Sequence, residues 1–511
     1  VGDTESLAAD GTATVTNSLG FSNTVDVSGF SELVINPLGG TDSITINASA
    51  NFAGGIQVVG GDSDGTGDRV VLVGRAGDDT IGVTLASGVV TGVVGGGITL
   101  ASVEQLEIDV NGTAGGDSVT INGLGSVNGL EQIDVTLAGN ALDSLAVVGS
   151  SDDDTIVFRA LSTTAGEVTA DGSGLVIGYS NRLDDGSLVL SGGSAGFDVV
   201  RVQGGDAADT ITSNSATRIN LVGSVDLGSD LDRLDLVTGD GDDTVTLSHA
   251  IALPKFVDVG DGNDTVDLSG AGAVDPTILG GAGDDVLIGT PGIDLILGGQ
   301  GNDTITGGQG ADSVFGEEGA DTINWSSGDG VGEIEGGSGS DLFVYNLTAG
   351  VDAVSVDARS DLRLTFDDTV SAVTIGSTES ISINVGAGAD TVSLGDLSGT
   401  GVARIDVDLG AGSVDSVTVA GTAAGDDLEI NSVGSTSTLK GLASDVIIAN
   451  LEAADALSAT LGGGSDRVSV TGVADPIGLD VATGLVTGVS AASVTVSGVE
   501  SFAVAGGASS R

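Results

Sequence analysis

The sequence predicts an all-β fold, an elongated parallel β-solenoid (β-helix) with a distinct central block of repeats. Short alternations of apolar and polar residues, such as "DSVTIN" at 117–122 and "DTVTLS" at 243–248, are typical of half-buried strands. Glycine supplies 88 of the 511 residues, which favours many tight turns. A nine-residue pattern also recurs in tandem from 280 to 324, and a fixed short period indicates stacked coils.

Composition limits both the core and the chemistry. Hydrophobic residues make up 40% of the chain but aromatic residues only 3%, so Val, Ile, Leu and Ala must build the core. Cysteine and methionine are absent, which excludes disulfides and fits an oxidising exterior. No run of 18 apolar residues occurs, so we expect no membrane span. The formal net charge of −59 argues against nucleic-acid binding and predicts that cations neutralise the chain.

The tandem block contains five consecutive nonapeptides. They are "GGAGDDVLI" (280–288), "GTPGIDLIL" (289–297), "GGQGNDTIT" (298–306), "GGQGADSVF" (307–315) and "GEEGADTIN" (316–324). After an insert that contains Trp325, "GGSGSDLFV" (336–344) restores the pattern at Asp341. Upstream, "GDGDDTVTL" (239–247) holds Asp243 and "GDGNDTVDL" (260–268) holds Asp264, 21 residues apart. A step near 20 residues is what one coil of a β-solenoid uses.

The flanking segments follow a looser plan, which divides the chain into three parts. A Glu opens an alternating strand, a Gly-rich turn with an Asp follows, and a second strand ends the unit, as in 104–121 and 379–394. We therefore predict N-terminal solenoid repeats at 1–238, a β-roll that contains the tandem block at 239–344 and C-terminal solenoid repeats at 345–511. Aspartates in the flanking turns can cap their own turns without a metal. The last Glu-led strand begins at Glu500, either as a frayed repeat or as one completed by further chain or a partner.

Each nonapeptide has a turn part and a strand part. Glycine at the first, second and fourth positions allows positive φ and a close approach of two backbones. The last three residues form a minimal strand whose central side chain points inward. These inward residues are Leu287, Ile296, Ile305, Val314 and Ile323. Two nonapeptides complete one coil, so each unit lies over the second unit after it. Asp285, Asp303 and Asp321 should then form one column, and Asp294 and Asp312 the other.

Stacked carboxylates repel one another unless a cation lies between them. Ca²⁺ suits such a gap, because it accepts six to eight oxygens and backbone carbonyls of the glycine turns can complete the set. Mg²⁺ requires a stricter octahedron and retains its waters. Zn²⁺ prefers Cys and His, and the chain has no Cys and only His249. The columns therefore predict several bound calcium ions.

The block resembles the RTX (repeats-in-toxin, hemolysin-type) calcium-binding β-roll, whose signature is GGxGxDxUx. The resemblance covers 280–324, with related units at 239–268 and 336–344. It implies that turn aspartates and turn carbonyls bind Ca²⁺. By position, the implied ligands are Asp243, Asp264, Gly280, Gly281, Gly283, Asp285, Asp294, Gly298, Gly299, Gly301, Asp303, Gly307, Gly308, Gly310, Asp312, Asp321 and Asp341. Thr290–Pro291 and Glu317–Glu318 depart from the signature, and each departure can weaken a site.

Catalytic interpretations have weaker support. The run Asp152–Asp154 fits either a glycosidase-like pair or an ion-binding turn, and the turn is the simpler interpretation. His249 follows Ser248, but adjacent residues of a strand point to opposite faces, so we expect no nucleophile–base pair. Lys255 and Lys440 lie in no membrane-active stretch, which argues against a pore-forming toxin. We therefore expect a protein that is not an enzyme.

The remaining hypotheses concern scaffolds outside the cell. RTX-like repeats of this composition resemble those of bacterial surface-layer proteins. That resemblance favours a calcium-binding structural protein, a subunit or segment of a surface layer, filament or matrix that associates with copies of itself. One alternative is the stalk of a large RTX adhesin. Another is a secreted polysaccharide-modifying enzyme with an RTX module, although such a site needs clustered basic and aromatic residues that the sequence does not show.

Overall fold

A computed structural model describes most of the chain in segments that include every unit of the tandem block. The described residues are 4–7, 12–16, 22–26, 33–35, 42–47, 56–59, 68–74, 79–92, 97–110, 117–124, 130–137, 144–150, 155–162, 165–170, 175–180, 187–191, 197–215, 218–221, 224–251, 255–330, 332–358, 364–367, 372–412, 414–452, 454–471, 478–480, 485–487, 493–499 and 501–504. The run Asp152–Asp154 and Glu500 lie outside them.

The chain divides into two units, of which the first comprises Val1–Asp240 with Thr244–Val257. Its strands are β1 (Thr4–Leu7), β2 (Thr12–Thr16), β3 (Ser22–Asp26), β4 (Leu33–Ile35), β5 (Ser43–Asn47), β6 (Ile56–Val59), β7 (Arg69–Val73), β8 (Thr80–Thr84), β9 (Val89–Thr91), β10 (Ile98–Ala101), β11 (Gln105–Asp109), β12 (Ser118–Leu124), β13 (Gln132–Thr136), β14 (Ser144–Gly149), β15 (Thr155–Ser162), β16 (Ala165–Ala170), β17 (Val176–Ser180), β18 (Ser187–Ser191), β19 (Val199–Gln203), β20 (Thr210–Ser215), β21 (Arg218–Leu221), β22 (Ser224–Leu227), β23 (Arg233–Val237) and β24 (Thr244–Thr246). A single 3₁₀ helix, η1 (Leu85–Ser87), is the one helical element of the described residues.

The second unit comprises Gly241–Asp243 with Asp258–Arg511, and β25 (Lys255–Asp258) lies at the division. Its strands are β26 (Thr265–Asp267), β27 (Thr277–Ala282), β28 (Val286–Ile288), β29 (Leu295–Gln300), β30 (Thr304–Thr306), β31 (Ser313–Glu318), β32 (Thr322–Ser326), β33 (Gly332–Ser338), β34 (Leu342–Asn346), β35 (Ala353–Ala358), β36 (Leu364–Asp367), β37 (Ala372–Gly376), β38 (Ser380–Asn384), β39 (Thr391–Leu394), β40 (Arg404–Asp408), β41 (Ser416–Ala420), β42 (Asp427–Val433), β43 (Thr436–Lys440), β44 (Asp445–Ala449), β45 (Ala456–Thr460), β46 (Arg467–Thr471), β47 (Gly478–Asp480), β48 (Leu485–Thr487), β49 (Ser493–Ser497) and β50 (Ser501–Val504).

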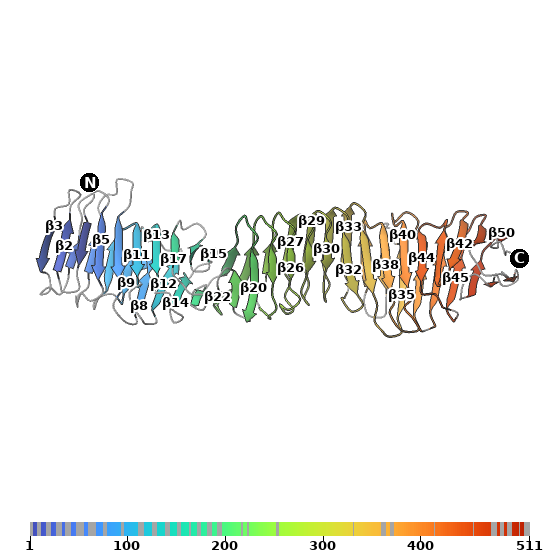
Figure 1. Cartoon of the computed structure of the whole chain (residues 1–511), viewed down its shortest axis with the longest axis horizontal. Helices are drawn as coiled ribbons and strands as arrows, with labels where there is room; N and C mark the ends of the chain where they lie inside the picture. The colour runs from blue at the N-terminus through green and yellow to red at the C-terminus, as the bar shows by residue number, and fades with distance from the viewer. Residues whose placement is uncertain are drawn as a thin grey trace. The chain divides into compact units, whose positions relative to one another are not determined.

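Strands of the tandem block stack in parallel and in register, which confirms the predicted β-solenoid. Successive strands of the block alternate between two sheets, and β27, β29 and β33 are near neighbours in one of them (Figure 1). In the other sheet Leu287 pairs with Ile305, and Ile305 pairs with Ile323. All five predicted inward side chains are at most 1% exposed. The x-U-x pattern therefore places one aliphatic side chain per strand in a continuous core.

Antiparallel hairpins interrupt the parallel stacking, and the sequence pattern did not predict them. In the second unit, β36 pairs antiparallel with both β35 and β37, and β43 does so with β42 and β44. In the first unit β15, β16 and β17 form a similar antiparallel set. Such a set lengthens the coil: Leu342 pairs with Ser380, 38 residues later. Coils outside the block are therefore longer without leaving the same two sheets.

The core changes after the tandem block. Trp325 and Tyr345 are fully buried, and β32 and β34 place them as a register pair. Phe343 stacks against Tyr345 with ring centroids 6.0 Å apart. Aromatic side chains therefore replace the aliphatic core where the coils become longer. No helix within the described segments is long and apolar enough to cross a membrane. The predicted three-part division of the chain stays a prediction.

Candidate metal centre

Aspartates of alternate nonapeptides form a hydrogen-bonded column in the second unit. The backbone N–H of Asp285 donates to Oδ1 of Asp303 at 2.9 Å, and that of Asp303 donates to Oδ1 of Asp321 at 2.8 Å. The same bond joins Asp243 to Asp264, Asp264 to Asp285, Asp321 to Asp341 and Asp341 to Glu379. The predicted column is confirmed, and it is longer than predicted because Asp243 and Asp264 extend it at one end and Asp341 and Glu379 at the other.

A second column runs along the strands of the other sheet. The backbone N–H of Asp294 donates to Oδ1 of Asp312 at 2.9 Å, as the stacking of alternate units predicts. Asp294 directly precedes β29 and Asp312 directly precedes β31, whereas the first column precedes β28, β30 and β32. In each sheet of the block, the strands therefore begin directly after that sheet's own row of aspartates.

In most of these carboxylates the other oxygen is buried without a hydrogen bond. The aspartates of both columns are each only 1% exposed. At six of these positions, the Oδ2 atom has no hydrogen-bond partner. These positions are Asp264, Asp285, Asp303, Asp312, Asp321 and Asp341. A buried carboxylate oxygen without a donor is costly unless it is protonated or lies against a cation. The columns are therefore incomplete as purely protein structures.

Burial raises the pKa of the aspartates in these columns. Together with the neighbouring carboxylates, it raises the pKa of Asp285 to about 7 and that of Asp303 to about 6. Burial likewise raises the pKa of Asp264 and of Asp312 to about 6. The backbone hydrogen bond that each carboxylate accepts opposes the shift without cancelling it. Near neutral pH, metal-free Asp285 would therefore be partly protonated, so a cation and a proton compete for its oxygens.

The glycines of the turn have two different roles, which corrects the expectation of positive φ at all three. Gly281 and Gly283, at the second and fourth positions, have φ of 106° and 135°. The first glycine has no such φ. A Cβ on Gly298 would instead lie 2.3 Å from Asp303 Oδ2 and 2.7 Å from the Gly316 carbonyl oxygen. The first position is therefore glycine because the carboxylate and the next coil's carbonyl occupy its side-chain space.

The fourth glycine brings the carbonyls of successive coils together. A Cβ on Gly301 would lie 2.0 Å from the carbonyl oxygen of Gly283, and Gly310 stands in the same relation to Gly292. The second glycine repeats this: Gly299 faces the carbonyl oxygen of Gly281. Carbonyl oxygens at positions one and four thus lie near the carboxylates: the Gly316 carbonyl and Asp303 Oδ2 share the space beside Gly298, and the Gly292 carbonyl and Asp312 Oδ1 share that beside Gly310. The remaining predicted glycines, Gly280, Gly307 and Gly308, occupy equivalent places.

A further ladder lies at the fifth position, and the sequence reasoning missed it. Oδ1 of Asp242 accepts from the N–H of Asn263, whose own Oδ1 accepts from Asp284. Asp284 Oδ1 then accepts from Asn302, and Asn302 Oδ1 from Ala320. These bonds run in the opposite direction to those of the buried column. The signal was present in the repeated Asp-Asp and Asn-Asp pairs that end four of these turns.

The two nonapeptides that depart from the signature differ structurally. Thr290 donates from both its N–H and its hydroxyl to the carboxylate of Asp294. The backbone N–H and the hydroxyl of Thr290 therefore supply donors that the Oδ2 atoms of most other column aspartates lack, which gives the predicted weakened site a physical reason. Glu317 instead adopts the positive φ of a glycine, 77°, and keeps the turn conformation at a cost in backbone strain.

The donors present fit Ca²⁺ better than a transition metal. No three His, Cys, Asp or Glu side chains within the described segments converge closely enough to hold a metal by themselves. Backbone carbonyls must therefore supply most of the ligands, and a mixed set of carboxylate and carbonyl oxygens suits Ca²⁺. The uncompensated Oδ2 atoms would supply the charged ligands.

Comparison with known families decides the nature of the block. The family model of the RTX calcium-binding nonapeptide repeat, in four copies, matches residues 277–296 and 288–323. Residues 277–323 carry RTX repeats. RTX repeats are calcium-binding sequences, which supports Ca²⁺ as the cation of the columns. The individual ligands and the number of ions stay predictions. No curated protein matches the chain.

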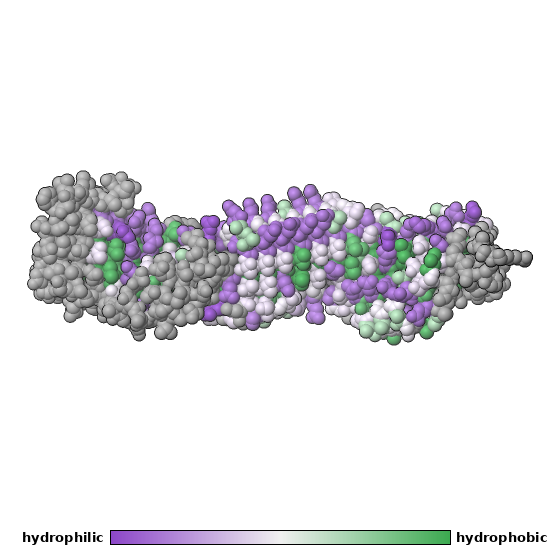
Figure 2. Space-filling model, viewed as in Figure 1, coloured by the Kyte–Doolittle hydropathy of each residue, from purple (hydrophilic) through white to green (hydrophobic). Residues whose placement is uncertain are grey.

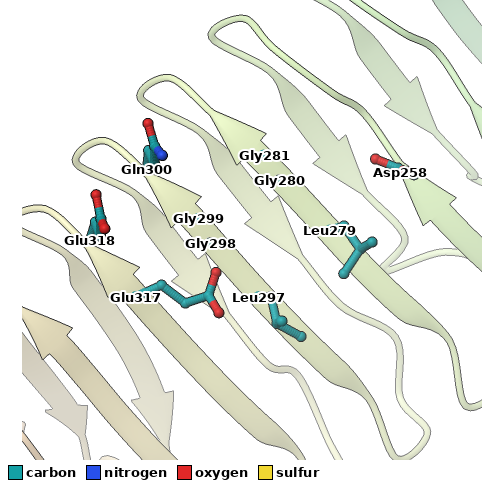
Figure 3. A pocket seen from close by; sticks show the side chains of 10 residues that line it. All are labelled: Asp258, Leu279, Gly280, Gly281, Leu297, Gly298, Gly299, Gln300, Glu317 and Glu318. Atoms are coloured by element: carbon teal, nitrogen blue, oxygen red, sulfur yellow. The ribbon is translucent and has the colours of Figure 1, made fainter.

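A groove lies on the outer face of the RTX strands (Figure 3). It is lined by Asp258, Leu279, Gly280, Gly281, Leu297, Gly298, Gly299, Gln300, Glu317 and Glu318. Its floor is glycine backbone and leucine, and Glu317 extends beside it. Figure 2 shows hydrophilic residues gathered along the edge beside β27 and β29. The acid groups at this groove would repel an anionic substrate such as a uronate polysaccharide.

The Ser248–His249 pair corrects one geometric expectation. The two residues follow β24 rather than lying within it, so they do not point to opposite faces. Ser248 Oγ lies 3.1 Å from Nδ1 of His249, and Nδ1 lies 3.1 Å from the Ser213 carbonyl oxygen. Within the described segments no carboxylate hydrogen-bonds to His249. The pair thus lacks the orienting acid of a catalytic triad.

Proposed function

We propose that the chain is a calcium-dependent structural protein outside the cell, a subunit or segment of a bacterial surface layer, filament or matrix. The observation that carries the proposal is the column from Asp243 to Glu379. It passes through seven successive turns and leaves one buried carboxylate oxygen uncompensated in most of them. Calcium bound between these turns would join successive coils and rigidify them.

The same observation favours an extracellular location. A site assembled from single carboxylates and backbone carbonyls is suited to a compartment where free Ca²⁺ is abundant, because extracellular modules bind Ca²⁺ with dissociation constants of about 10⁻⁴–10⁻³ M. Folding of the columns would then follow export. The absence of Cys and Met from the sequence is consistent with that compartment.

The residues found at the groove and at the Ser248–His249 pair favour a structural role over a catalytic one. The groove offers glycine, leucine, glutamine and carboxylates, and the Ser248–His249 pair has no orienting acid. Stacked coils also present strand edges at their ends, which can pair with further copies. Association between copies or segments of the same chain is therefore part of the proposal.

Electron microscopy of the purified chain in Ca²⁺ and in a chelator tests this function. Ordered layers or filaments that form only with Ca²⁺ support it. Monomers under both conditions would reject self-assembly and favour the stalk of an adhesin. Cleavage of an acidic polysaccharide by the purified chain would reject the non-enzymatic assignment.

A further inference from the structure

A turn outside the RTX-matched segment reproduces the geometry of the turn at Asp312. Asp390 directly precedes β39, as Asp312 directly precedes β31. It accepts at Oδ1 from the backbone N–H of Asp352 at 2.8 Å, as Asp312 accepts from Asp294 at 2.9 Å. The strands that follow also match, since β35 pairs with β39 in parallel as β29 pairs with β31.

The carbonyls around the two aspartates match as well. A Cβ on Gly388 would lie 1.7 Å from the Gly350 carbonyl oxygen and 2.7 Å from Asp390 Oδ1. A Cβ on the equivalent Gly310 would lie 1.7 Å from the Gly292 carbonyl oxygen and 2.9 Å from Asp312 Oδ1. Four residues before each aspartate, a glycine with positive φ faces a threonine carbonyl. A Cβ built on Gly386 would lie 2.7 Å from Thr348 O, and one built on Gly308 would lie 2.4 Å from Thr290 O.

The preceding coil is also built alike in the two places. Thr348 donates from its N–H and its hydroxyl to the carboxylate of Asp352, as Thr290 does to Asp294. In both places the threonine hydroxyl also accepts from the glycine two residues later. The carboxylates of Asp294 and Asp352 are therefore satisfied by protein donors. In the next coil, Oδ2 of Asp312 and of Asp390 has no such donor.

Asp390 also has a buried carboxylate oxygen without a hydrogen bond. Asp390 is 2% exposed, and its Oδ2 is buried with no hydrogen-bond partner, as is Oδ2 of Asp312. Above it, the N–H of Asp390 donates to Oδ1 of Asp415, so a further carboxylate adjoins the turn. An uncompensated buried oxygen among carbonyls and carboxylates is costly unless it is protonated or lies against a cation, and oxygens of these two kinds are the ligands that Ca²⁺ prefers.

We propose that the turn at Asp390 is a further Ca²⁺ site, formed by Asp390 with backbone carbonyls of Thr348 and Gly350 and equivalent to the turn at Asp312. The sequence period conceals it because the antiparallel set β35–β37 separates Asp352 from Asp390 by 38 residues, where Asp294 and Asp312 are 18 apart. Calcium dependence would then extend beyond the RTX repeats. This inference rests on the proposed calcium-dependent scaffold.

Calcium binding to the full chain, measured by isothermal titration calorimetry or equilibrium dialysis, tests the site. Asp390→Asn keeps an amide oxygen for the Asp352 N–H and removes the charge. We expect it to lower the stoichiometry by one Ca²⁺ per chain, as we expect of Asp312→Asn. Asp396→Asn, which removes a carboxylate that only caps the N–H of Ser398, should leave the stoichiometry unchanged.

Thermal melts separate a binding role from a merely structural one. In chelator, Asp390→Asn should melt no lower than the unmodified chain, because an uncompensated buried charge is removed. Its stabilisation by added Ca²⁺ should be smaller. A stoichiometry that falls in Asp312→Asn but not in Asp390→Asn would overturn this inference alone. A chain that binds no Ca²⁺ at all would overturn the proposed function with it, whereas calcium binding without assembly would overturn only the assembly.

Discussion

The N–H of Asp285 donates to Oδ1 of Asp303, 18 residues later, at 2.9 Å. This bond aligns two coils and at the same time fixes which carboxylate oxygen remains for a cation. Oδ1 is used by the backbone, and Oδ2 is buried without a partner. Stacking and calcium binding are therefore linked in the same side chain, and the following predictions test that link.

Replacing Asp303 by Asn should weaken calcium binding more than it weakens the metal-free fold. The amide oxygen can still accept from Asp285, while the charged ligand is lost. We expect fewer bound Ca²⁺ and a smaller rise in melting temperature on adding Ca²⁺, measured by calorimetry. Asp267→Asn is the matched control, because Asp267 lies outward on β26 and caps Ser269. Equal losses in the two variants would contradict a specific role for the column.

The metal-free protein should be more stable at pH 5 than at pH 8. Burial raises the pKa of Asp285 to about 7 and that of Asp303 to about 6, above an unfolded value of about 3.9. The folded state therefore holds protons that the unfolded state has released. That stability is complete below the unfolded pKa and is lost as the pH rises through the folded values.

Trp325 is a suitable reporter for this pH dependence, because it is the single tryptophan and is fully buried beside the column. Its fluorescence should follow thermal unfolding of the adjacent coils. Asp285→Asn should flatten the dependence, and saturating Ca²⁺ should protect the coils at pH 8. A metal-free melting temperature that increases from pH 5 to pH 8 would show that these carboxylates are ionised in the folded state.

Threonine 290 should stabilise its turn without calcium. Its hydroxyl lies 2.5 Å from the Val274 carbonyl oxygen and 2.9 Å from Asp294 Oδ1, between which its proton is shared, and it accepts from the N–H of Gly292. Thr290→Ala should lower the free energy of unfolding in chelator by about 2 kcal/mol, since each lost bond costs about 1 kcal/mol. Thr290→Ser retains the hydroxyl and should lose much less. Urea denaturation measures both, and equal losses would assign the effect to the methyl group.

Replacing Gly298 by Ala should damage the RTX turn through crowding rather than through backbone strain. The added Cβ would lie 2.3 Å from Asp303 Oδ2 and 2.7 Å from the Gly316 carbonyl oxygen. We expect a loss of about 1–3 kcal/mol in unfolding free energy and weaker Ca²⁺ binding. Gly205→Ala is the control, because no atom lies within 4 Å of its Cβ position. Unchanged calcium affinity in Gly298→Ala would separate the first glycine from the site.

Sequence by itself determined the repeating part of this protein. The nine-residue period placed Asp285, Asp303 and Asp321 in one column and made Ile305 part of the core, and the structure confirms both. The reason is physical: a short coil of constant length repeats every neighbour relationship, so one spacing describes the whole stack. The prediction of positive φ failed only at the first glycine, whose constraint comes from an atom of another residue.

Only the tertiary structure decided which residues from distant segments of the chain lie beside one another. The match of Asp390 to Asp312 appears only after a 38-residue step and a three-stranded antiparallel set are folded into the sheet. Likewise, Thr290 satisfies Asp294 through the geometry of one turn, which its residue type did not reveal. Hydrogen bonds are short and directional, so which carboxylate oxygen is left for calcium is determined by how the coils align.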